Sequence, residues 1–299
     1  MFTISVPASS ANIGPGFDSA GIAVSRYLTL QVRPSETWEF THITPAIPTV
    51  RNYKDHYIYK VAKQVADWKK SNLPPAHVTM NSEIPLARGL GSSASAIVAG
   101  IELANQLCEL HLTKEQKLDY AVKIEGHPDN VVPCLLGGFV VTVKMEKESY
   151  YKKLPTINTD LVVYIPNFEL KTEEARKVLP ESFSMDDAVT ASAIGNLMIT
   201  ALLTEDYTLA GKMMESDLFH EKYRAKLIQN YYEIRSNAKQ LGAYGTVISG
   251  AGPTMISFVP QGKGKEIAQE MEHLLSDYEV TALQLDENGL QVKVNINSK

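Results

Sequence analysis

Cysteine is scarce in this chain of 299 residues, which contains only Cys108 and Cys134. Neither residue belongs to a Cys-x-x-Cys pair, and nothing nearby completes a zinc-binding spacing. So little cysteine excludes a disulfide-stapled scaffold. We therefore expect two reduced, partly buried thiols and a core that is held together by apolar packing.

The chain also lacks the patterns that mark nucleic-acid and membrane proteins. Lysine and arginine do not cluster beyond short pairs such as Lys69–Lys70, and the formal net charge is −5. Because a duplex-binding protein usually carries a basic stripe, we expect no nucleic-acid partner. The N-terminal segment has no signal-peptide pattern, and no apolar run approaches the ~18 residues of a membrane span. These absences predict a cytoplasmic protein without a membrane partner.

Apolar periodicity predicts a chain that mixes helices and strands. Alternation or short apolar runs predict strands at 2–7, 22–33, 38–40, 77–84, 139–145 and 161–166, a strand–turn–strand at 247–259 and a hairpin at 280–294. Helical spacing predicts helices at 57–68, 94–107, 113–124, 226–241 and 264–277, and a helix after Ser184 whose Ala191, Ile194, Leu197, Met198 and Leu202 share a face. A polar, lysine-rich segment at 145–160 predicts the boundary between two halves.

Glycine is ordinary in number, 18 of 299 residues, but its placement is informative. The segment 85–95, which we name loop two, holds Gly89, Gly91 and two adjacent serines between a predicted strand and a predicted helix. Glycines let the backbone approach a ligand closely, and the start of a helix offers free N–H groups and partial positive charge. Hydroxyl groups there can donate to phosphate oxygens or bind Mg²⁺. Loop two therefore predicts phosphate binding.

Two well-known phosphate loops match loop two less well. The Walker A pattern GxxxxGK[ST] is absent. Residues 89–94 do satisfy GxGxxA, the dinucleotide fingerprint, but that fold needs a second strand ending in an acidic residue about 20 residues later. The region 112–124 is predicted to be a helix instead. A nicotinamide-dependent dehydrogenase therefore stays as an alternative of a different class.

Two other loops combine glycine with small polar residues. Loop one spans residues 7–18 and contains Gly14 and Gly16, and loop three spans 249–254 and contains Gly250 and Gly252. One such loop is weak evidence for a ligand site. Three in one chain predict that the loops converge on one charged small molecule.

These motifs resemble those of the GHMP small-molecule kinases. Loops one, two and three are similar to motifs one, two and three of that superfamily. Within it, PASSANIGPGFD, GLGSSAS, EGHPDN (125–130) and SGAGPT together are most similar to the homoserine kinases. The resemblance runs from residue 5 to about 260. One departure is Ser95, where the superfamily commonly has alanine.

The resemblance implies an α+β architecture, the two-domain GHMP kinase fold. The N-terminal α/β domain, residues 1–155, would bind ATP and contain a left-handed βαβ unit, although the general rule favours a right-handed crossover. The C-terminal domain, residues 156–299, would be ferredoxin-like and complete the substrate site. A homodimer is compatible with this fold, and the oligomeric state stays open.

The resemblance also implies an activity and its cofactors. The γ-phosphoryl group of ATP would pass to the side-chain hydroxyl of L-homoserine, giving O-phospho-L-homoserine for threonine biosynthesis. Ser93 is the expected hydroxyl ligand of Mg²⁺, with Ser92 as the alternative, and Glu125 is the expected carboxylate partner. The expected ATP-binding residues are Pro85, Leu86, Ala87, Arg88, Gly89, Leu90, Gly91, Ser92, Ser93, Ala94 and Ser95.

A zwitterionic substrate needs binding groups of both charges. We expect Asp18 to hold the ammonium group, with Asn12 beside it as a neutral hydrogen-bonding partner. Arg176 and Arg224 are the candidates for the carboxylate, because a guanidinium group matches a carboxylate bidentately. The alternative for both arginines is a surface salt bridge, such as one between Arg176 and Glu173. The expected substrate-binding set also includes Asn130, Thr172, Gly250 and Gly252.

Asn130 resembles the residue that holds the reacting hydroxyl group. The resemblance implies no dedicated general base, and phosphoryl transfer depends mostly on positioning and charge neutralisation. We expect the hydroxyl proton to pass to the phosphate while Asn130 orients the nucleophile, with Asp129 as the rival base. His127 is interpreted as structural, His220 forms no ligand spacing, and Tyr231–Tyr232 are interpreted as packing residues.

Two alternatives lie closer to this hypothesis than the dehydrogenase does. The first is another GHMP kinase acting on mevalonate or a sugar, but mevalonate has no ammonium group to pair with Asp18. The second is a catalytically idle nucleotide sensor. Ser93 and Glu125 argue against a sensor, since a sensor has less need of a complete metal site.

Overall fold

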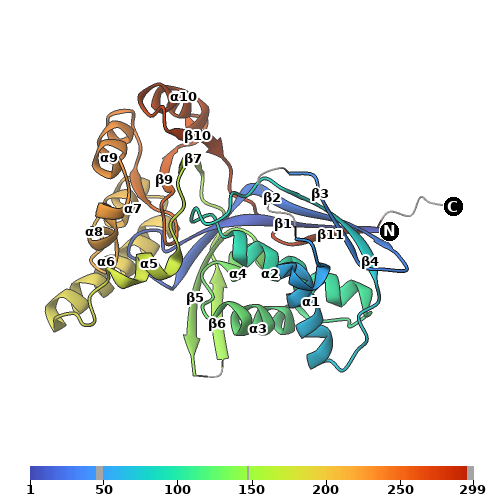
Figure 1. Ribbon diagram of the computed structural model, residues 1–299. Coiled ribbons are helices and arrows are strands. Elements are labelled where there is room, and N and C mark those ends of the chain that lie inside the picture. Colours follow the sequence, from blue (N-terminus) through green and yellow to red (C-terminus); the bar gives the residue numbers. More distant parts are fainter. Residues whose placement is uncertain (45–49, 147, 295–299) are drawn as a thin grey trace.

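A computed structural model of the chain describes residues 1–44, 50–146 and 148–294 (Figure 1). The strands in these ranges are β1 (Phe2–Ala11), β2 (Ala20–Pro34), β3 (Glu39–His42), β4 (Ala76–Ser82), β5 (Phe139–Met145), β6 (Glu148–Lys153), β7 (Thr159–Pro166), β8 (Gly245–Ile248), β9 (Met255–Pro260), β10 (Tyr278–Leu283) and β11 (Gln291–Val294). The helices are α1 (Tyr57–Trp68), α2 (Ser92–Leu107), α3 (Lys114–Glu125), α4 (Val131–Leu136), α5 (Thr172–Lys177), α6 (Met185–Leu203), α7 (Tyr207–Met214), α8 (Glu221–Arg224), α9 (Tyr231–Gln240) and α10 (Gly264–Leu274).

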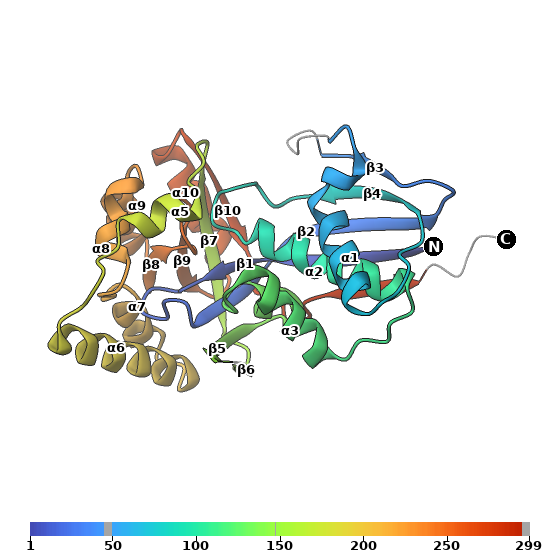
Figure 2. The same cartoon turned by 60° about the horizontal axis from the view of Figure 1, so that its bottom comes forward.

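The first sheet contains seven of the described strands. Its main path is β11-β1-β2-β4-β3, and the antiparallel pair β5–β6 joins it through β2. Helices α1 to α4 lie together against this sheet (Figures 1 and 2). The long helix α2 contacts α1 and β1, and its Ile97 and Ile101 are buried there. This packing holds the first turn of α2, where loop two ends, close to the strands that carry loop one.

The βαβ unit of the first half lies at β3, α1 and β4. β3 and β4 are neighbours and run parallel, and the chain between them passes through α1. Parallel neighbouring strands require such a crossover connection. The left hand that the resemblance implies for this crossover stays a prediction.

The second sheet contains four described strands in the order β10-β7-β9-β8, and its neighbours all pair antiparallel. In chain order this is the βαββαβ arrangement of a ferredoxin-like unit, which confirms the predicted architecture. One face of the sheet packs against α9 and α10. Leu161, Val163 and Phe258 on the other face belong to the same core as the first sheet. The two sheets therefore share a continuous apolar core.

The predicted hairpin at 280–294 is wrong. β10 pairs with β7 in the second sheet, whereas β11 pairs with β1 in the first (Figure 1). Between them, the Asp286 carboxylate accepts hydrogen bonds from the backbone N–H groups of Asn288 and Gly289 and fixes a turn there. The first sheet therefore contains a strand from beyond residue 156. The boundary between 155 and 156 stays a prediction, and residues 295–299 lie outside the described residues.

The predicted helix at 226–241 begins later than expected. Asn230 adopts a left-handed conformation, with φ 59°, and α9 starts at the next residue. Tyr231 and Tyr232 therefore open the helix instead of lying in its second turn. The predicted shared face of α6 is also partly wrong, because Leu197 is exposed while Ala191, Met198 and Leu202 are buried.

The predicted N-terminal caps of two helices are confirmed. Thr113 and Gln116 form the reciprocal capping box of α3, and Ser184 caps α6 by accepting from the Asp187 backbone. Within the described residues, no helix combines the length and the apolar character that a membrane crossing requires.

Candidate active site

The three glycine-rich loops meet, as the sequence predicted. The backbone N–H of Gly250 in loop three donates to the carbonyl of Ala11 in loop one, at 3.0 Å. The Ser249 hydroxyl donates to the carbonyl of Gly89 in loop two, at 2.6 Å. The backbone N–H of Ser9 in loop one donates to the carbonyl of Leu90 in loop two at 3.2 Å. Each loop thus contacts the other two, and together they form one wall of a cleft.

Close packing explains why loop two needs its glycines. Gly89 and Gly91 have φ of 77° and 67°, in the left-handed region that side chains disfavour. A Cβ on Gly91 would overlap the Ser9 hydroxyl, and one on Gly89 would overlap the carbonyl of Ser249. Any larger residue at either position would push the loops apart.

The cleft at this junction has a volume of about 600 Å³. Most residues of the predicted site line it: Asn12, Asp18, Ala87, Gly89, Gly91, Ser92, Ser93, Glu125, Asn130, Thr172, Arg176, Arg224, Gly250 and Gly252. His127 and Asp129 line it as well, as do Leu170, Lys171, Glu173 and Ala251, which sequence reasoning did not select. Lys171 precedes a predicted residue directly, but an isolated lysine carries no motif that would have marked it.

Ser93 and Glu125 come together although 32 residues separate them. The Ser93 hydroxyl donates to Oε2 of Glu125 at 3.1 Å, from the first turn of α2 to the last residue of α3. Burial raises the pKa of Glu125, because its charged form is poorly solvated there. A hydroxyl beside a desolvated carboxylate fits a hard divalent cation that also takes phosphate oxygens and water. The described residues contain no group of three or more His, Cys, Asp or Glu side chains that could hold a metal without such additional ligands.

The HPDN segment places three polar side chains at the cleft. Oδ1 of Asn130 accepts a hydrogen bond from the Ser9 hydroxyl at 2.9 Å, which orients the amide and leaves its NH₂ group free to donate. His127 Nδ1 lies 3.0 Å from Oδ1 of the buried Asp129. The hydrogen bond to Asp129 raises the pKa of His127. The Asp129 carboxylate therefore already has a hydrogen-bonding partner, His127, within the cleft.

Asp18 and Arg176 face each other across the cleft. The Arg176 guanidinium group binds both carboxylate oxygens of Asp18, at 2.8 and 3.2 Å, so the ion pair is bidentate. The Asp18 backbone N–H donates to the side chain of Asn12 at 3.0 Å, which brings the predicted pair of neighbours together. Arg176 thus pairs with a predicted site residue, and the alternative of a pair with Glu173 is wrong.

Arg224 is buried, with 2% of its surface exposed, so the alternative of a surface salt bridge is wrong for this residue. Its Nε donates to the carbonyl of Ala175 at 3.1 Å, and Nη1 donates to the carbonyl of Gly250 at 3.0 Å. Burial lowers the pKa of Arg224 to about 10. None of the hydrogen bonds found among the described residues uses Nη2, so this nitrogen is left to bind an anion in the cleft.

Some predicted residues of loop two turn away from the cleft. The Arg88 side chain donates to the carbonyls of Pro166 and Asn167, and the buried Ser95 hydroxyl donates to the carbonyl of Pro7. Leu90 and Ala94 are buried in the core. These side chains fix the shape of loop two, and their contact with ATP stays a prediction.

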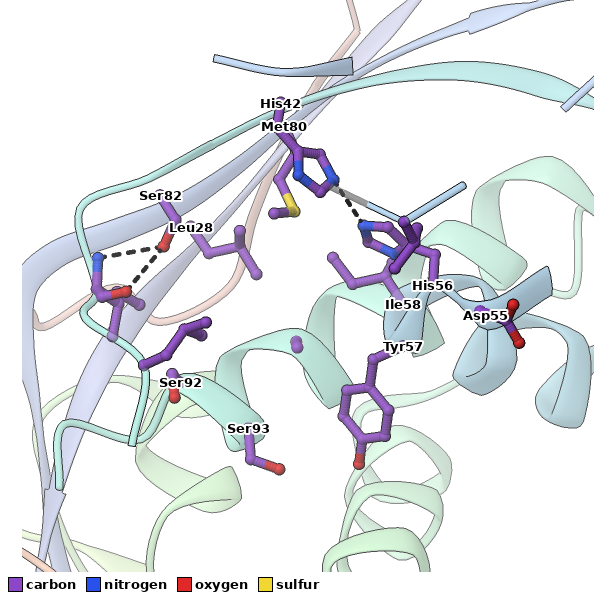
Figure 3. Close-up of a pocket in the computed structure, with 14 residues that line it drawn as sticks. Leu28, His42, Asp55, His56, Tyr57, Ile58, Met80, Ser82, Ser92 and Ser93 are labelled. Carbon is purple, nitrogen blue, oxygen red and sulfur yellow. Dashed lines mark hydrogen bonds between the residues drawn. The ribbon is translucent and has the colours of Figure 1, made fainter. Parts of the chain in front are cut away.

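A second cavity of about 390 Å³ adjoins the cleft and shares Ser92 and Ser93 with it (Figure 3). Its remaining walls are mostly apolar and come from β2, β4, α1, loop two and α2: Leu28, Ile58, Met80, Ile84, Leu86 and Ala96. His42 and His56 also line it, with their Nε2 atoms 3.0 Å apart. Sequence reasoning missed this cavity, because scattered apolar residues carry no signal beyond that of an ordinary core.

Comparisons with known proteins agree with the motifs. The family model "GHMP kinases N terminal domain" matches residues 56–138, and "GHMP kinases C terminal" matches residues 198–277. The homoserine kinase of Oceanobacillus iheyensis is 51% identical over 98% of this chain and 99% of its own. The homoserine kinase structure from Cytophaga hutchinsonii has a TM-score of 0.86 at 27% identity, covering 98% of this chain and 97% of its own. The crystal structure of L. major mevalonate kinase in complex with R-mevalonate is similar in fold, with a TM-score of 0.74 at 18% identity over 95% of each chain.

Proposed function

The chain belongs to the homoserine kinases of the GHMP kinase family, and from this premise we propose how its cleft phosphorylates L-homoserine with ATP. The reaction transfers the γ-phosphoryl group to the side-chain hydroxyl and yields O-phospho-L-homoserine, a precursor for threonine. The observation that carries the proposal is the meeting of three glycine-rich loops at one cleft. The Ser93–Glu125 pair lies in this cleft, as do Asp18, Arg176 and Arg224.

Homoserine binds where the charged side chains gather. Its carboxylate takes Nη2 of Arg224 and the guanidinium fork of Arg176, and its ammonium group takes Asp18. Thr172, Gly250 and Gly252 surround the same space. Because Asp18 and Arg176 bind each other in the free cleft, a ligand with both charges can replace both halves of that ion pair. A mevalonate-type substrate, which lacks an ammonium group, would leave Asp18 without a partner.

ATP binds along loop two, with its phosphates at the first turn of α2. Backbone N–H groups and the helix dipole favour negative charge there. We assign the adenine base to the second cavity, whose apolar walls suit a flat heterocycle and which opens onto Ser92 and Ser93 (Figure 3). The His42–His56 pair adds two imidazole rings to the wall of this cavity.

Ser93 and Glu125 are the residues that would hold Mg²⁺, and their 3.1 Å separation and the burial of Glu125 support this assignment. Bound Mg²⁺ would neutralise charge on the phosphate oxygens. Asn130, oriented by Ser9, holds the substrate hydroxyl in line with the γ-phosphate. No residue is assigned as a general base, since the proton can pass to the phosphate itself.

A kinase assay tests the proposed function. The protein is incubated with ATP and Mg²⁺ and separately with homoserine, mevalonate, galactose or serine, and ADP release is measured. We expect ADP release that depends on homoserine and far exceeds that with the other acceptors. Activity with mevalonate or galactose instead would assign the chain to another GHMP branch, and nucleotide binding without turnover would indicate a sensor.

The absence of a dedicated base is tested separately. Asp129→Asn keeps the size of the side chain and removes the only carboxylate of the HPDN segment. If the proton passes to the phosphate, Asp129→Asn retains turnover once ATP and homoserine are saturating. Loss of turnover with unchanged binding of both ligands would instead assign the base role to Asp129.

A further inference from the structure

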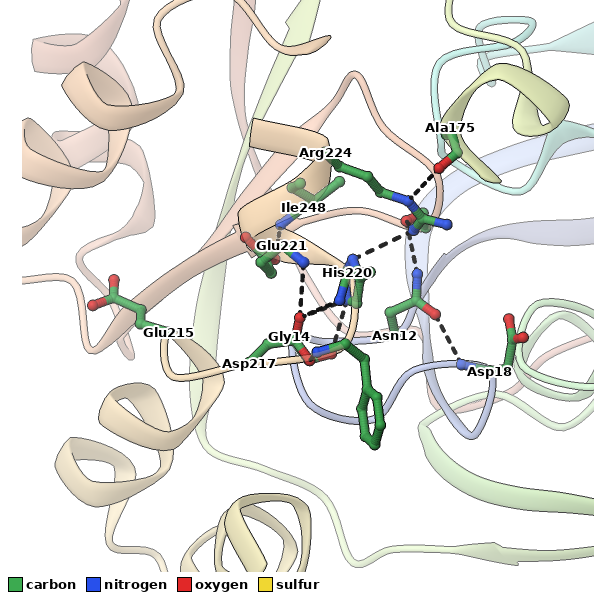
Figure 4. Close-up of polar contacts among 12 residues, drawn as sticks. Asn12, Gly14, Asp18, Ala175, Glu215, Asp217, His220, Glu221, Arg224 and Ile248 are labelled. Carbon is green, nitrogen blue, oxygen red and sulfur yellow. Dashed lines mark hydrogen bonds and ion pairs between the residues drawn. The ribbon is translucent and has the colours of Figure 1, made fainter. Parts of the chain in front are cut away.

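His220 lies behind the substrate end of the cleft, where sequence reasoning gave it no role. It is fully buried and precedes α8, the short helix that carries Arg224 (Figure 4). Its Nε2 lies 2.9 Å from the carbonyl oxygen of Gly14 in loop one, and its Nδ1 lies 3.3 Å from Nη1 of Arg224. One imidazole ring therefore touches both loop one and the arginine that we assign to the substrate carboxylate.

These two contacts define the tautomer of His220. A carbonyl oxygen only accepts hydrogen bonds, so Nε2 must carry the hydrogen. A guanidinium nitrogen only donates, so Nδ1 must keep its lone pair. The neutral ring with hydrogen on Nε2 satisfies both neighbours at once. Burial lowers the pKa of His220 to about 4, which agrees with a ring that stays neutral.

The contacts of His220 close a ring of hydrogen bonds. Nη1 of Arg224 and Nδ2 of Asn12 both donate to the carbonyl of Gly250, at 3.0 and 2.7 Å. His220 joins Arg224 to Gly14, which lies two residues from Asn12 in loop one. Loop one is therefore tied to Arg224 at two points, through Gly250 and through His220.

The surroundings hold the imidazole in place. The Asp217 carboxylate accepts from the backbone N–H groups of His220 and Glu221, at 2.7 and 2.8 Å. The Phe17 ring stacks on the imidazole with its centroid 5.2 Å away, and it also lies 5.3 Å from the Arg224 guanidinium carbon. These contacts leave the ring little freedom to rotate away from Arg224, and Figure 4 shows Asp217 beside His220.

We propose that His220 is a positioning residue for the homoserine site, which joins Arg224 to loop one so that the carboxylate-binding and ammonium-binding groups keep a fixed separation. Loop one carries Asp18, and Arg224, whose Nη2 makes none of the hydrogen bonds found among the described residues, lines the cleft. A zwitterion of fixed length requires this separation to be constant. The inference rests on the proposed function, because it takes Arg224 and Asp18 as the groups that bind homoserine.

Three substitutions of His220 separate its two contacts. His220→Phe keeps a flat ring but removes both hydrogen bonds. His220→Asn places an amide oxygen near the position of Nδ1 and can still accept from Arg224. His220→Gln places an amide nitrogen near the position of Nε2 and can still donate to Gly14.

We expect His220→Phe to raise KM for homoserine about tenfold, the effect of losing a hydrogen bond to a charged group. KM for ATP should stay unchanged, and kcat should be little affected. His220→Asn and His220→Gln should each recover part of the loss.

Two measurements distinguish positioning from a general structural role. The first compares homoserine with 3-aminopropan-1-ol, which lacks the carboxylate, and a positioning role predicts that His220→Phe weakens homoserine far more. The second combines His220→Phe with Arg224→Ala. Once Arg224 is absent, His220→Phe should add nothing further to KM for homoserine.

The matched control is Tyr164→Phe, which removes another buried hydrogen bond, to Ser257, in the second sheet. It should lower the melting temperature without changing KM for homoserine.

If the wild-type protein shows no homoserine-dependent ADP release, the proposed function fails and this inference fails with it. If the wild-type protein is active but His220→Phe leaves KM unchanged, or its effect adds fully to that of Arg224→Ala, only the positioning role of His220 is overturned. Should His220→Phe fail to fold, the Asn and Gln variants provide the same comparison.

Discussion

Different kinds of groups form the two ends of the cleft. We call the end at loop two and the second cavity the nucleotide end, and the end at Asp18, Arg176 and Arg224 the substrate end. At the nucleotide end, we assign the binding to backbone groups of loop two, the start of α2 and an apolar cavity. At the substrate end, Asp18, Arg176 and Arg224 arrive from three distant segments and are held by hydrogen bonds and an ion pair. A phosphate can be bound by one local motif. A zwitterion needs opposite charges at a fixed distance, which only the tertiary structure provides.

The largest effect should come from the nucleotide end. Glu125→Gln removes the carboxylate that we assign to Mg²⁺, and we expect kcat to fall by at least about a hundredfold, since a bound metal contributes several kcal/mol to phosphoryl transfer. KM for homoserine should change little. Steady-state kinetics with varied Mg²⁺ checks this, with Glu115→Gln, at the other end of α3, as the matched control. Equal losses in both variants would contradict the assignment.

At the substrate end, Arg224→Ala should change binding of one substrate only. Loss of a charged hydrogen-bonding partner costs about 1.5–3 kcal/mol, so KM for homoserine should rise roughly tenfold to a hundredfold. KM for ATP should stay constant, in contrast to the effects at the nucleotide end. Arg33→Ala, whose side chain contacts His77 on the surface of the first sheet, is the control. An unchanged KM for homoserine would remove Arg224 from the site.

Each end of the cleft also contains a buried histidine that stays neutral. Burial lowers the pKa of His56 and of His220 to about 4, below the ordinary value of 6.5. Each histidine has a lower pKa in the folded protein than in the unfolded chain. As the pH falls below the pKa of the unfolded chain, the unfolded state takes up a proton that the folded state does not, and the folded state loses stability until the pH reaches its own pKa. Between about pH 7 and about pH 5, each histidine should lower the free energy of unfolding by about 2 kcal/mol.

Urea unfolding at several pH values measures this loss. His56→Phe should make the free energy of unfolding depend less on pH, because it removes the buried histidine at the nucleotide end. His220→Phe should have the same effect, because it removes the one at the substrate end. The sum of the two reductions should exceed either one. A pH dependence that neither variant changes would show that other groups control it.

The smallest effect should come from Arg176, which lies at the open side of the cleft. About 40% of its side-chain surface is exposed, as is 38% for its partner Asp18. Exposed ion pairs contribute up to about 1 kcal/mol, so Arg176→Gln should raise KM for homoserine by no more than about fivefold. The ratio of the Arg224→Ala effect to the Arg176→Gln effect measures how much burial matters. A ratio below one would reverse the comparison between the two arginines.

The sequence predicted the parts of the site that depend on local chemistry. Loop two and the capping box at Thr113 each depend on a few neighbouring residues, so their patterns are readable without the fold. The convergence of the three loops was also predicted, because three glycine-rich loops with small polar residues occur in one chain. The roles of Asp18, Arg176 and Arg224 required the family resemblance, since no spacing in the chain connects them.

The sequence could not predict features that depend on distant segments. The hairpin at 280–294 was wrong because alternation shows that a strand forms but not which strand it pairs with. The start of α9 was missed because helical spacing alone does not show that Asn230 takes the left-handed conformation, which asparagine adopts more readily than most residues. His220 was missed because it contributes through Arg224, and the second cavity because its apolar walls resemble any core.

The pairing of β11 with β1 has a consequence for how the protein is made. A ribosome completes β1 first, but the strand that covers its outer edge is synthesised only after both sheets' other strands have emerged. During most of translation β1 therefore presents an unpaired edge, the kind of surface on which nascent chains aggregate. The last strand closes that edge, so the first sheet is completed only after the strands of the second sheet have been made.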